Sequence, residues 1–240
     1  MNIKDAKRSK LDLKHAYEKL KEAHGEIIDA YEDMFLRLAI TAEYKDPGIG
    51  GHIRRVSDYS IAIARSMSLP EGEVLILRYA SMMHDIGKVG IPDRILEKSS
   101  AFTPEERKEM EKHTAIGSSI FEGSGFPMIK AAADIALSHH EKYDGTGYPK
   151  GLKGERIPLY GRIVAVADHF DAFVSERCYK IAQSFDAGMA EIEKNAGIFF
   201  DPRVVIAFIK IRDTIKEILS ASGVIENFKK EAGYVDSKGV

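Results

Sequence analysis

The chain has 240 residues, 44% of them hydrophobic, which suits one substantial core with an appendage. Its net charge of −2 argues against a broad surface for duplex nucleic acid, so an anionic substrate must meet local positive charge. The apolar runs are far shorter than the roughly 20 residues of a membrane span, and one cysteine gives no disulfide framework. We therefore expect a cytoplasmic chain with no membrane span and no apolar signal region.

The first forty or so residues predict one long helix, because they contain no proline and no glycine except Gly25. Apolar residues recur there every seven positions, and a second set follows each by four: Leu13, Leu20, Ile27 and Met34, then Tyr17, His24, Tyr31 and Leu38. Two stripes on one face are typical of a helix that pairs with another. We favour a parallel homodimeric coiled coil over one amphipathic helix packed on its own domain, and assign residues 1–45 to a signalling or dimerisation helix.

Flexible residues 46–51 interrupt this helix, and His52 opens the next one. Leu69-Pro70-Glu71 then starts a helix that delivers His84 and Asp85. The apolar run of that helix ends at Gly87, a residue type common at helix ends.

Strong start signals mark the middle of the chain. Thr103-Pro104-Glu105-Glu106 predicts a capping box with proline at the first helical position, and this helix carries His113. Pro127 starts a helix over residues 128–138 that ends in the pair His139-His140. The glycine-rich residues 141–154 that follow predict a loop.

The last third of the chain is also helical. A helix over residues 159–175 carries Asp168 and Asp171 one turn apart, hence on one side. Ser184 caps a helix that runs through Asn195, and Asp201-Pro202 begins the last long helix. Because no segment alternates with a period of two, we predict an all-α fold, with one domain over residues 46–220 and a frayed tail over 221–240.

The stretch from Met82 to Lys88 places a histidine next to a carboxylate where a helix stops. Helical neighbours project about 100° apart, so His84 and Asp85 cannot face each other, but both can contact one ion at the helix end. An isolated pair of this kind is more often hydrogen-bonded in a core. Lys88 adds a cation about one turn beyond Asp85, where an anionic substrate could use it.

Further histidines favour the metal interpretation. The candidate ligands come from several predicted helices: His52, His84, Asp85, His113, His139, His140 and Asp168. Imidazole and carboxylate without thiolate suit Fe, Mn, Zn, Ni or Co better than a structural zinc. Seven ligands are too many for one ion with an open position. Two ions that share Asp85 would use them all, an arrangement that activates a bridging hydroxide for in-line attack on phosphorus.

Two motifs resemble the HD-GYP branch of the HD phosphohydrolase superfamily. His84-Asp85-Ile86-Gly87-Lys88 is similar to its HD signature, and the stretch from His139-His140-Glu141 to Gly147-Tyr148-Pro149 is similar to its HHE…DGxGYP signature. The similarity covers about residues 46–208. It implies a five-helix HD core with extra C-terminal helices, and a metal-dependent phosphodiesterase that opens cyclic di-GMP to pGpG and often continues to GMP.

The resemblance also assigns ligands. By position, the first metal site of the family matches His52, His84, Asp85 and Asp168. The second matches Asp85, His113, His139 and His140. Two divalent ions are expected, with iron or manganese favoured and zinc, nickel or cobalt possible.

Other positions match catalytic and substrate-binding residues. Lys88 would act with Asp85 in catalysis by stabilising developing charge or serving the leaving oxygen; otherwise it is a solvated lysine. Arg177 and Lys180 match positions that hold substrate phosphate. Tyr148 is expected beside the substrate or a guanine base, or else packed on its own turn. Asp171 is counted with the substrate-binding residues, could instead orient a ligand histidine, or is a solvated helix acid.

One position departs from the family pattern. Members with a third metal carry glutamate where this chain has Gly48, so we expect a binuclear site. The alternatives are a phosphodiesterase for another cyclic dinucleotide such as 3′3′-cyclic GMP-AMP, a di-iron oxygenase, and a weakly active receptor that binds a dinucleotide or a GGDEF-domain partner at the Gly-Tyr-Pro loop. Positive charge at Lys88, Arg177 and Lys180 favours phosphate over oxygenase chemistry.

Overall fold

The computed structural model describes residues 3–42, 49–98, 100–175 and 182–221. These residues form helices and no strand, with one isolated bridge between Ala196 and Phe200, so the all-α prediction is confirmed for the part described. None of the described helices combines the length and the apolar character needed to cross a membrane.

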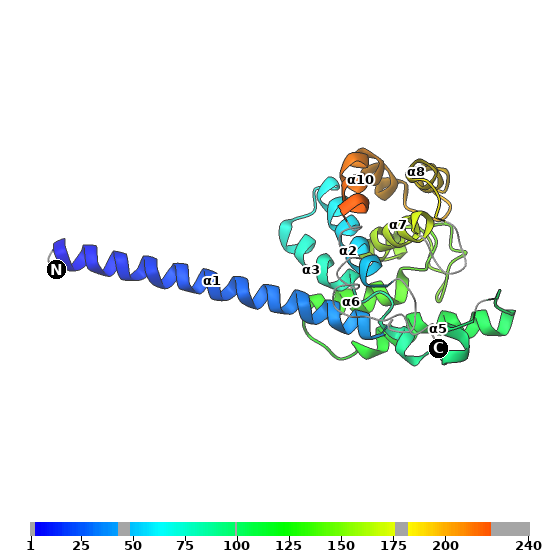
Figure 1. Cartoon of the computed structure of the whole chain (residues 1–240), viewed down its shortest axis with the longest axis horizontal. Helices are drawn as coiled ribbons and strands as arrows, with labels where there is room; N and C mark the ends of the chain where they lie inside the picture. The colour runs from blue at the N-terminus through cyan, green and yellow to red at the C-terminus, as the bar shows by residue number, and fades with distance from the viewer. Residues whose placement is uncertain (1–2, 43–48, 99, 176–181, 222–240) are drawn as a thin grey trace, which may run out of the picture.

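The N-terminal helix α1 (Ile3–Ala42) extends away from the helical body, as Figure 1 shows. Only its last turns pack on that body, where Phe35 and Ala39 are buried and the Phe35 ring lies 5.7 Å from the ring of Tyr79. The heptad stripe stays in solvent, with Leu13 71% and Leu20 68% exposed. Most of α1 is therefore not packed on its own domain, and the dimeric coiled coil stays a prediction.

Five helices build the central part of the fold: α2 (Ile49–Ser66), α3 (Glu71–Ser81), α5 (Pro104–Ile120), α6 (Pro127–Ser138) and α7 (Leu159–Val174). The helix α2 packs between α3 and α7, while α6 contacts α3, α5 and α7. Ile53, Leu77, Ile135, Ile163 and Phe170 are fully buried. Each such side chain contributes roughly 1.5–3 kcal/mol, so this interior fixes how α2, α3, α6 and α7 meet.

The remaining elements are short. A 3-10 turn, η1 (Ile86–Gly90), and α4 (Asp93–Leu96) connect α3 to α5, and a second 3-10 turn, η2 (Gly154–Arg156), precedes α7. Three C-terminal helices complete the fold: α8 (Phe185–Lys194), α9 (Pro202–Lys210) and α10 (Arg212–Ala221). The helix α8 packs on α7, and α9 and α10 cover α2.

The three helix starts predicted from capping residues agree with the structure. Thr103 and Glu106 form the reciprocal capping box, and Pro104 is the first residue of α5. Ser184 accepts a hydrogen bond from the Ala187 amide, and Asp201 accepts one from the Arg203 amide. Each cap satisfies an amide that the helix itself cannot pair, which stabilises the helix by about 1 kcal/mol.

Three predicted boundaries were wrong. The helix expected to open at His52 begins at Ile49, so its glycines lie inside the first turn. The helix α3 stops at Ser81, and Gly87 belongs to η1. The expected last long helix is broken at Ile211; both pieces pack on α2, and the break accompanies the complete burial of Ile215 from the second piece.

The tight packing of η1 on α5 explains why Gly87 is a glycine. A Cβ atom there would lie 1.9 Å from the carbonyl oxygen of His113 and 2.4 Å from the amide nitrogen of Gly117. The residue therefore allows a close backbone approach and does not end a helix.

Candidate metal centre

The seven predicted ligands come from five parts of the fold. His52 lies in the first turn of α2, His84 and Asp85 follow α3, and the others lie on α5, at the end of α6 and on α7: His113, His139, His140 and Asp168. They gather in two groups, and the ligand atoms within each group lie within 4.8 Å of one another. We call them the Asp168 group (His52, His84 and Asp168) and the His113 group (Asp85, His113, His139 and His140).

Asp85 lies between the two groups. Its Oδ1 is 3.2 Å from His113 Nε2 and 3.5 Å from His139 Nε2, both in the His113 group. Its Oδ2 is 3.5 Å from His84 Nε2, in the Asp168 group. Each carboxylate oxygen thus faces one group, which is the geometry of a bridging carboxylate.

Hydrogen bonds to the main chain fix which ring nitrogen faces the centre in three of the histidines. His84 Nδ1 lies 2.9 Å from the Ser81 carbonyl oxygen, His113 Nδ1 lies 2.7 Å from that of Met110, and His139 Nδ1 lies 3.0 Å from that of Ile135. A carbonyl can only accept, so Nδ1 carries the proton and Nε2 keeps its lone pair for a metal.

His52 is oriented by a side chain. Its Nδ1 lies 2.8 Å from Asp171 Oδ2, and its Nε2 lies 3.4 Å from Asp168 Oδ1. Asp171 is fully buried, and Arg55 donates to both of its carboxylate oxygens. Of the alternatives for Asp171, burial excludes a solvated acid and favours the orienting role over a substrate contact.

Unsatisfied polar atoms test whether the residues fit a metal. His84 Nε2 and Asp85 Oδ1 are buried and have no hydrogen-bond partner among the described residues. A buried polar atom without a partner costs about 1–3 kcal/mol, so such atoms are rare unless something binds them. Lone pairs from imidazole and carboxylate converge here, and this donor set fits divalent metal ions.

The protonation states also fit a cation. Burial lowers the pKa of His84 and His140, which keeps both imidazoles neutral near pH 7. Burial alone would raise the pKa of Asp85, but Lys88 and His84 hold it well below its ordinary value. Asp168 likewise has a lowered pKa, because neighbouring histidines outweigh its burial. Neutral imidazoles and ionised carboxylates are the forms that bind metals.

Lys88 belongs to the centre. Its Nζ lies 2.7 Å from Asp85 Oδ2, and its side chain is only 14% exposed. The interpretation as a solvated surface lysine is therefore wrong. Its ammonium group pairs with the carboxylate that joins the two groups.

Tyr148 covers the His113 group. Its ring stacks on that of His140, with centroids 4.9 Å apart, and its amide donates to the His140 carbonyl. The ring therefore packs on a candidate ligand, not on its own turn. Burial raises the pKa of Tyr148, so its hydroxyl keeps its proton.

Sequence reasoning gave Glu141 no role of its own. Its buried carboxylate accepts hydrogen bonds from the amides of Lys150 (2.8 Å) and Leu152 (2.9 Å), which closes the loop that carries Tyr148. Arg55 was also missed. The signal for Glu141 was a carboxylate directly before a glycine-rich loop, whereas no local pattern pointed to Arg55.

Residues 222–240 of the predicted frayed tail lie outside the described residues, and so do three single residues from the sequence analysis. These are Gly48, Arg177 and Lys180. The roles of Arg177 and Lys180 at the substrate phosphate, and the binuclear expectation drawn from Gly48, stay predictions.

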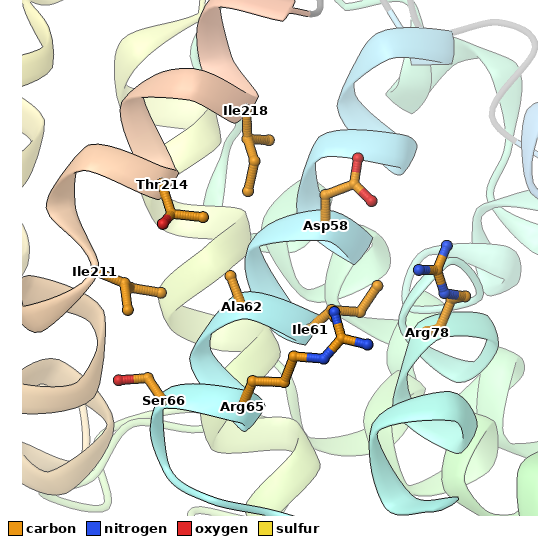
Figure 2. Close-up of a pocket in the computed structure, with 9 residues that line it drawn as sticks. All are labelled: Asp58, Ile61, Ala62, Arg65, Ser66, Arg78, Ile211, Thr214 and Ile218. Carbon is orange, nitrogen blue, oxygen red and sulfur yellow. The ribbon is translucent and has the colours of Figure 1, made fainter. Parts of the chain in front are cut away.

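A separate cavity of about 390 Å³ lies between α2, α3 and α10 (Figure 2). Ile61, Ile211 and Ile218 form apolar parts of its lining, and Arg65 and Arg78 lie at the same cavity. None of the seven candidate ligands lines it, so the cavity and the candidate metal centre are different places.

Fold and site together define an all-helical domain with a buried histidine–carboxylate centre. The sequence model described as "HD domain" matches residues 38–204. The chain belongs to the HD domain family, in its HD-GYP branch.

Curated relatives carry related names. A "Cyclic di-GMP phosphodiesterase" of Thermotoga maritima is 43% identical over 203 residues, which cover 83% of this chain and 55% of the relative. The "Cyclic di-GMP phosphodiesterase response regulator RpfG" of Xanthomonas campestris is 41% identical, with 84% and 53% covered. A "3'3'-cGAMP-specific phosphodiesterase 2" of Vibrio cholerae is 37% identical, with 72% and 33% covered. This chain spans about half the length of the first two.

A solved structure shares the fold. A cyclic GMP-AMP phosphodiesterase of V. cholerae superimposes with a TM-score of 0.59 and 21% identity, over 82% of this chain and 53% of that one. At this identity the likeness concerns the fold alone.

Proposed function

We propose that this chain is the catalytic part of a metal-dependent phosphodiesterase that hydrolyses cyclic di-GMP to pGpG. The observation that carries the proposal is the convergence of the two ligand groups on opposite oxygens of Asp85. Relatives that cover most of the chain and are named for this activity support the substrate class. Continuation to GMP is compatible with the same site.

The proposed cofactor is a pair of divalent transition-metal ions, with iron or manganese favoured over zinc, nickel or cobalt. The Asp168 group with Asp85 would hold one ion, and the His113 group the other. Bound ions would supply charge neutralisation at the phosphodiester and an activated water. The binuclear count rests on the ligand number and on Gly48.

The residues of the chain itself have distinct proposed tasks. The Lys88 ammonium lies beside Asp85, where it can stabilise negative charge on a phosphate or protonate the leaving oxygen. Tyr148 would bound the substrate space next to His140. Arg177 and Lys180 would hold substrate phosphate, as the family resemblance implies.

A second candidate substrate is 3′3′-cyclic GMP-AMP. Two V. cholerae relatives, each 37% identical, are named as specific for it. Both substrates present the same phosphodiester to the centre and differ in one base, so the base-binding residues would decide between them.

We also propose partners and a cellular compartment for the chain. The uncovered heptad stripe of α1 supports a homodimer formed by this helix. A GGDEF-domain partner at the Gly-Tyr-Pro loop is proposed from the family resemblance alone. The single cysteine fits a reducing compartment such as the cytoplasm.

Purified protein loaded with iron or manganese tests the function. We expect about two metal ions per chain and conversion of cyclic di-GMP to pGpG, followed by chromatography. The His84→Ala/Asp85→Ala double variant should lose metal and product together. Dinucleotide binding without turnover in the metal-loaded wild type would contradict hydrolysis and favour a receptor.

A further inference from the structure

Two facing helices present two matched pairs of side chains next to the Asp168 group. On α2, Arg55 follows His52 by three residues, so both side chains lie on one face. On α7, Asp171 follows Asp168 by the same interval. His52 faces Asp168 at 3.4 Å, and Arg55 pairs with Asp171 one turn deeper.

Arg55 makes a bidentate contact with the carboxylate of Asp171. Arg55 Nε donates to Asp171 Oδ1 at 2.5 Å, and Nη2 donates to Oδ2 at 2.9 Å and to Ser175 Oγ at 3.0 Å. The side chain of Asp171 is 1% exposed, and that of Arg55 is 13% exposed. A two-point contact with a planar guanidinium fixes both the position and the plane of the carboxylate.

The carboxylate plane matters because of what else binds Asp171. Its Oδ2 accepts a hydrogen bond from His52 Nδ1, at 2.8 Å. The other described Nδ1 contacts, at His84, His113 and His139, go to main-chain carbonyls that their own helical turns hold in place. The acceptor of His52 is a side chain that can rotate, so its direction must be fixed by another group.

We propose that Arg55 is a positioning residue for the Asp168 group. By holding Asp171, it fixes the ring orientation of His52 and keeps the proton on Nδ1, so that Nε2 is aimed at the metal position with His84 and Asp168. The inference rests on the proposed function in one respect, because it requires that this group binds metal. Arg55 acts through Asp171 and is not itself a candidate metal ligand.

Metal titration of the full chain tests this role. Isothermal titration of the metal-free protein with Mn²⁺ should resolve two sites in the wild type. In Arg55→Gln we expect one site to weaken about 10-fold or more, the usual effect of losing an outer-shell contact, while the other site keeps its affinity. In Arg55→Lys the Mn²⁺ affinity of that site should lie between those of the wild type and Arg55→Gln, because lysine keeps the charge but cannot make the two-point contact.

The matched control is the neighbouring arginine on the same helix. Arg54→Gln removes an arginine that makes no hydrogen bond to Asp171 among the described residues, and both Mn²⁺ affinities should stay at the wild-type value. Circular dichroism and the melting temperature report the fold of each variant. Equal weakening of both sites in Arg55→Gln would mean that the residue only ties α2 to α7, and would overturn the proposal.

A double-variant cycle covers the case in which Arg55→Gln does not fold. Asp171→Asn should weaken the same single site. Adding Arg55→Lys to Asp171→Asn should then weaken it no further, because the proposed effect of Arg55 on this site passes through Asp171. An additional loss in the double variant overturns the proposal.

The outcomes also separate this proposal from the proposed function. Wild-type Mn²⁺ affinities in Arg55→Gln overturn the positioning role and leave the phosphodiesterase intact. A wild-type chain that binds no divalent metal overturns both.

Discussion

At the scale of single residues, Lys88 lies at the candidate metal centre. Its pairing with Asp85 at 2.7 Å places a cation beside the carboxylate that joins the two ligand groups, in a place with little solvent. An ammonium in such surroundings acts on developing negative charge more strongly than in water.

We predict that Lys88→Ala lowers kcat for cyclic di-GMP about 100-fold, the usual effect of removing a positioned charge donor or general acid. Steady-state kinetics with metal content measured on the same samples checks this. The control is Lys112→Ala, which removes a lysine that is paired with Glu109 and largely exposed on α5. Unchanged kcat would remove Lys88 from the chemistry, and a parallel loss of metal would show that it serves Asp85 instead.

The residue scale also shows what sequence alone could supply. The types and spacing of the histidines indicated a metal, and the family resemblance sorted them into two sites. The pairing of Arg55 with Asp171 was out of reach, because 116 residues separate them and no periodic pattern links α2 to α7. The role of Glu141 would have been easier to predict, since its hydrogen-bond partners lie only nine and eleven residues ahead in the sequence.

At the scale of elements, the helix starts with a capping residue were predictable, whereas the start of α2, the end of α3 and the break at Ile211 were not. Thr103, Ser184 and Asp201 cap their helices through bonds to amides two or three residues ahead, so local sequence specifies them. The end of α3 at Ser81 and the break at Ile211 have no such local signal. Tertiary contacts decide both, through the packing of η1 on α5 and of α9 and α10 on α2.

The contact between η1 and α5 leads to a prediction. Gly87→Ala should destabilise the protein by about 3 kcal/mol or more, because the new methyl group would meet main-chain atoms of His113 and Gly117 that cannot move independently. Urea unfolding followed by circular dichroism measures the change. Gly72→Ala is the matched control: a Cβ there meets nothing within 4 Å, and the helix should gain up to about 1 kcal/mol. A stable Gly87→Ala protein would contradict the tight packing.

At the scale of the whole molecule, α1 connects an exposed stripe to the neighbourhood of the centre. Its last turns contact α3 through the Glu32–Arg78 ion pair at 3.4 Å and the rings of Phe35 and Tyr79. The same end of α1 packs against η1, the turn that carries Lys88. A second chain that binds the outer part of α1 would therefore act on a helix already in contact with this turn.

The stripe itself supports a prediction about assembly. Leu20→Asp with Ile27→Asp should convert a homodimer into a monomer, because these side chains, 68% and 54% exposed in one chain, would be buried between two. Losing the burial of each such side chain costs roughly 1.5–3 kcal/mol, and two per chain weaken the dimer about 1,000-fold or more. Analytical ultracentrifugation over a range of concentrations measures the change.

The control for this pair lies on the opposite side of α1. Glu22→Ala with Asp29→Ala alters two exposed residues outside both stripes, and should leave the association unchanged. Because all four altered residues are exposed and none is a candidate metal ligand, both double variants should keep the two Mn²⁺ sites of the wild type. A wild-type chain that sediments as a monomer at every concentration would contradict the coiled-coil homodimer. The stripe would then need a different partner helix to cover it.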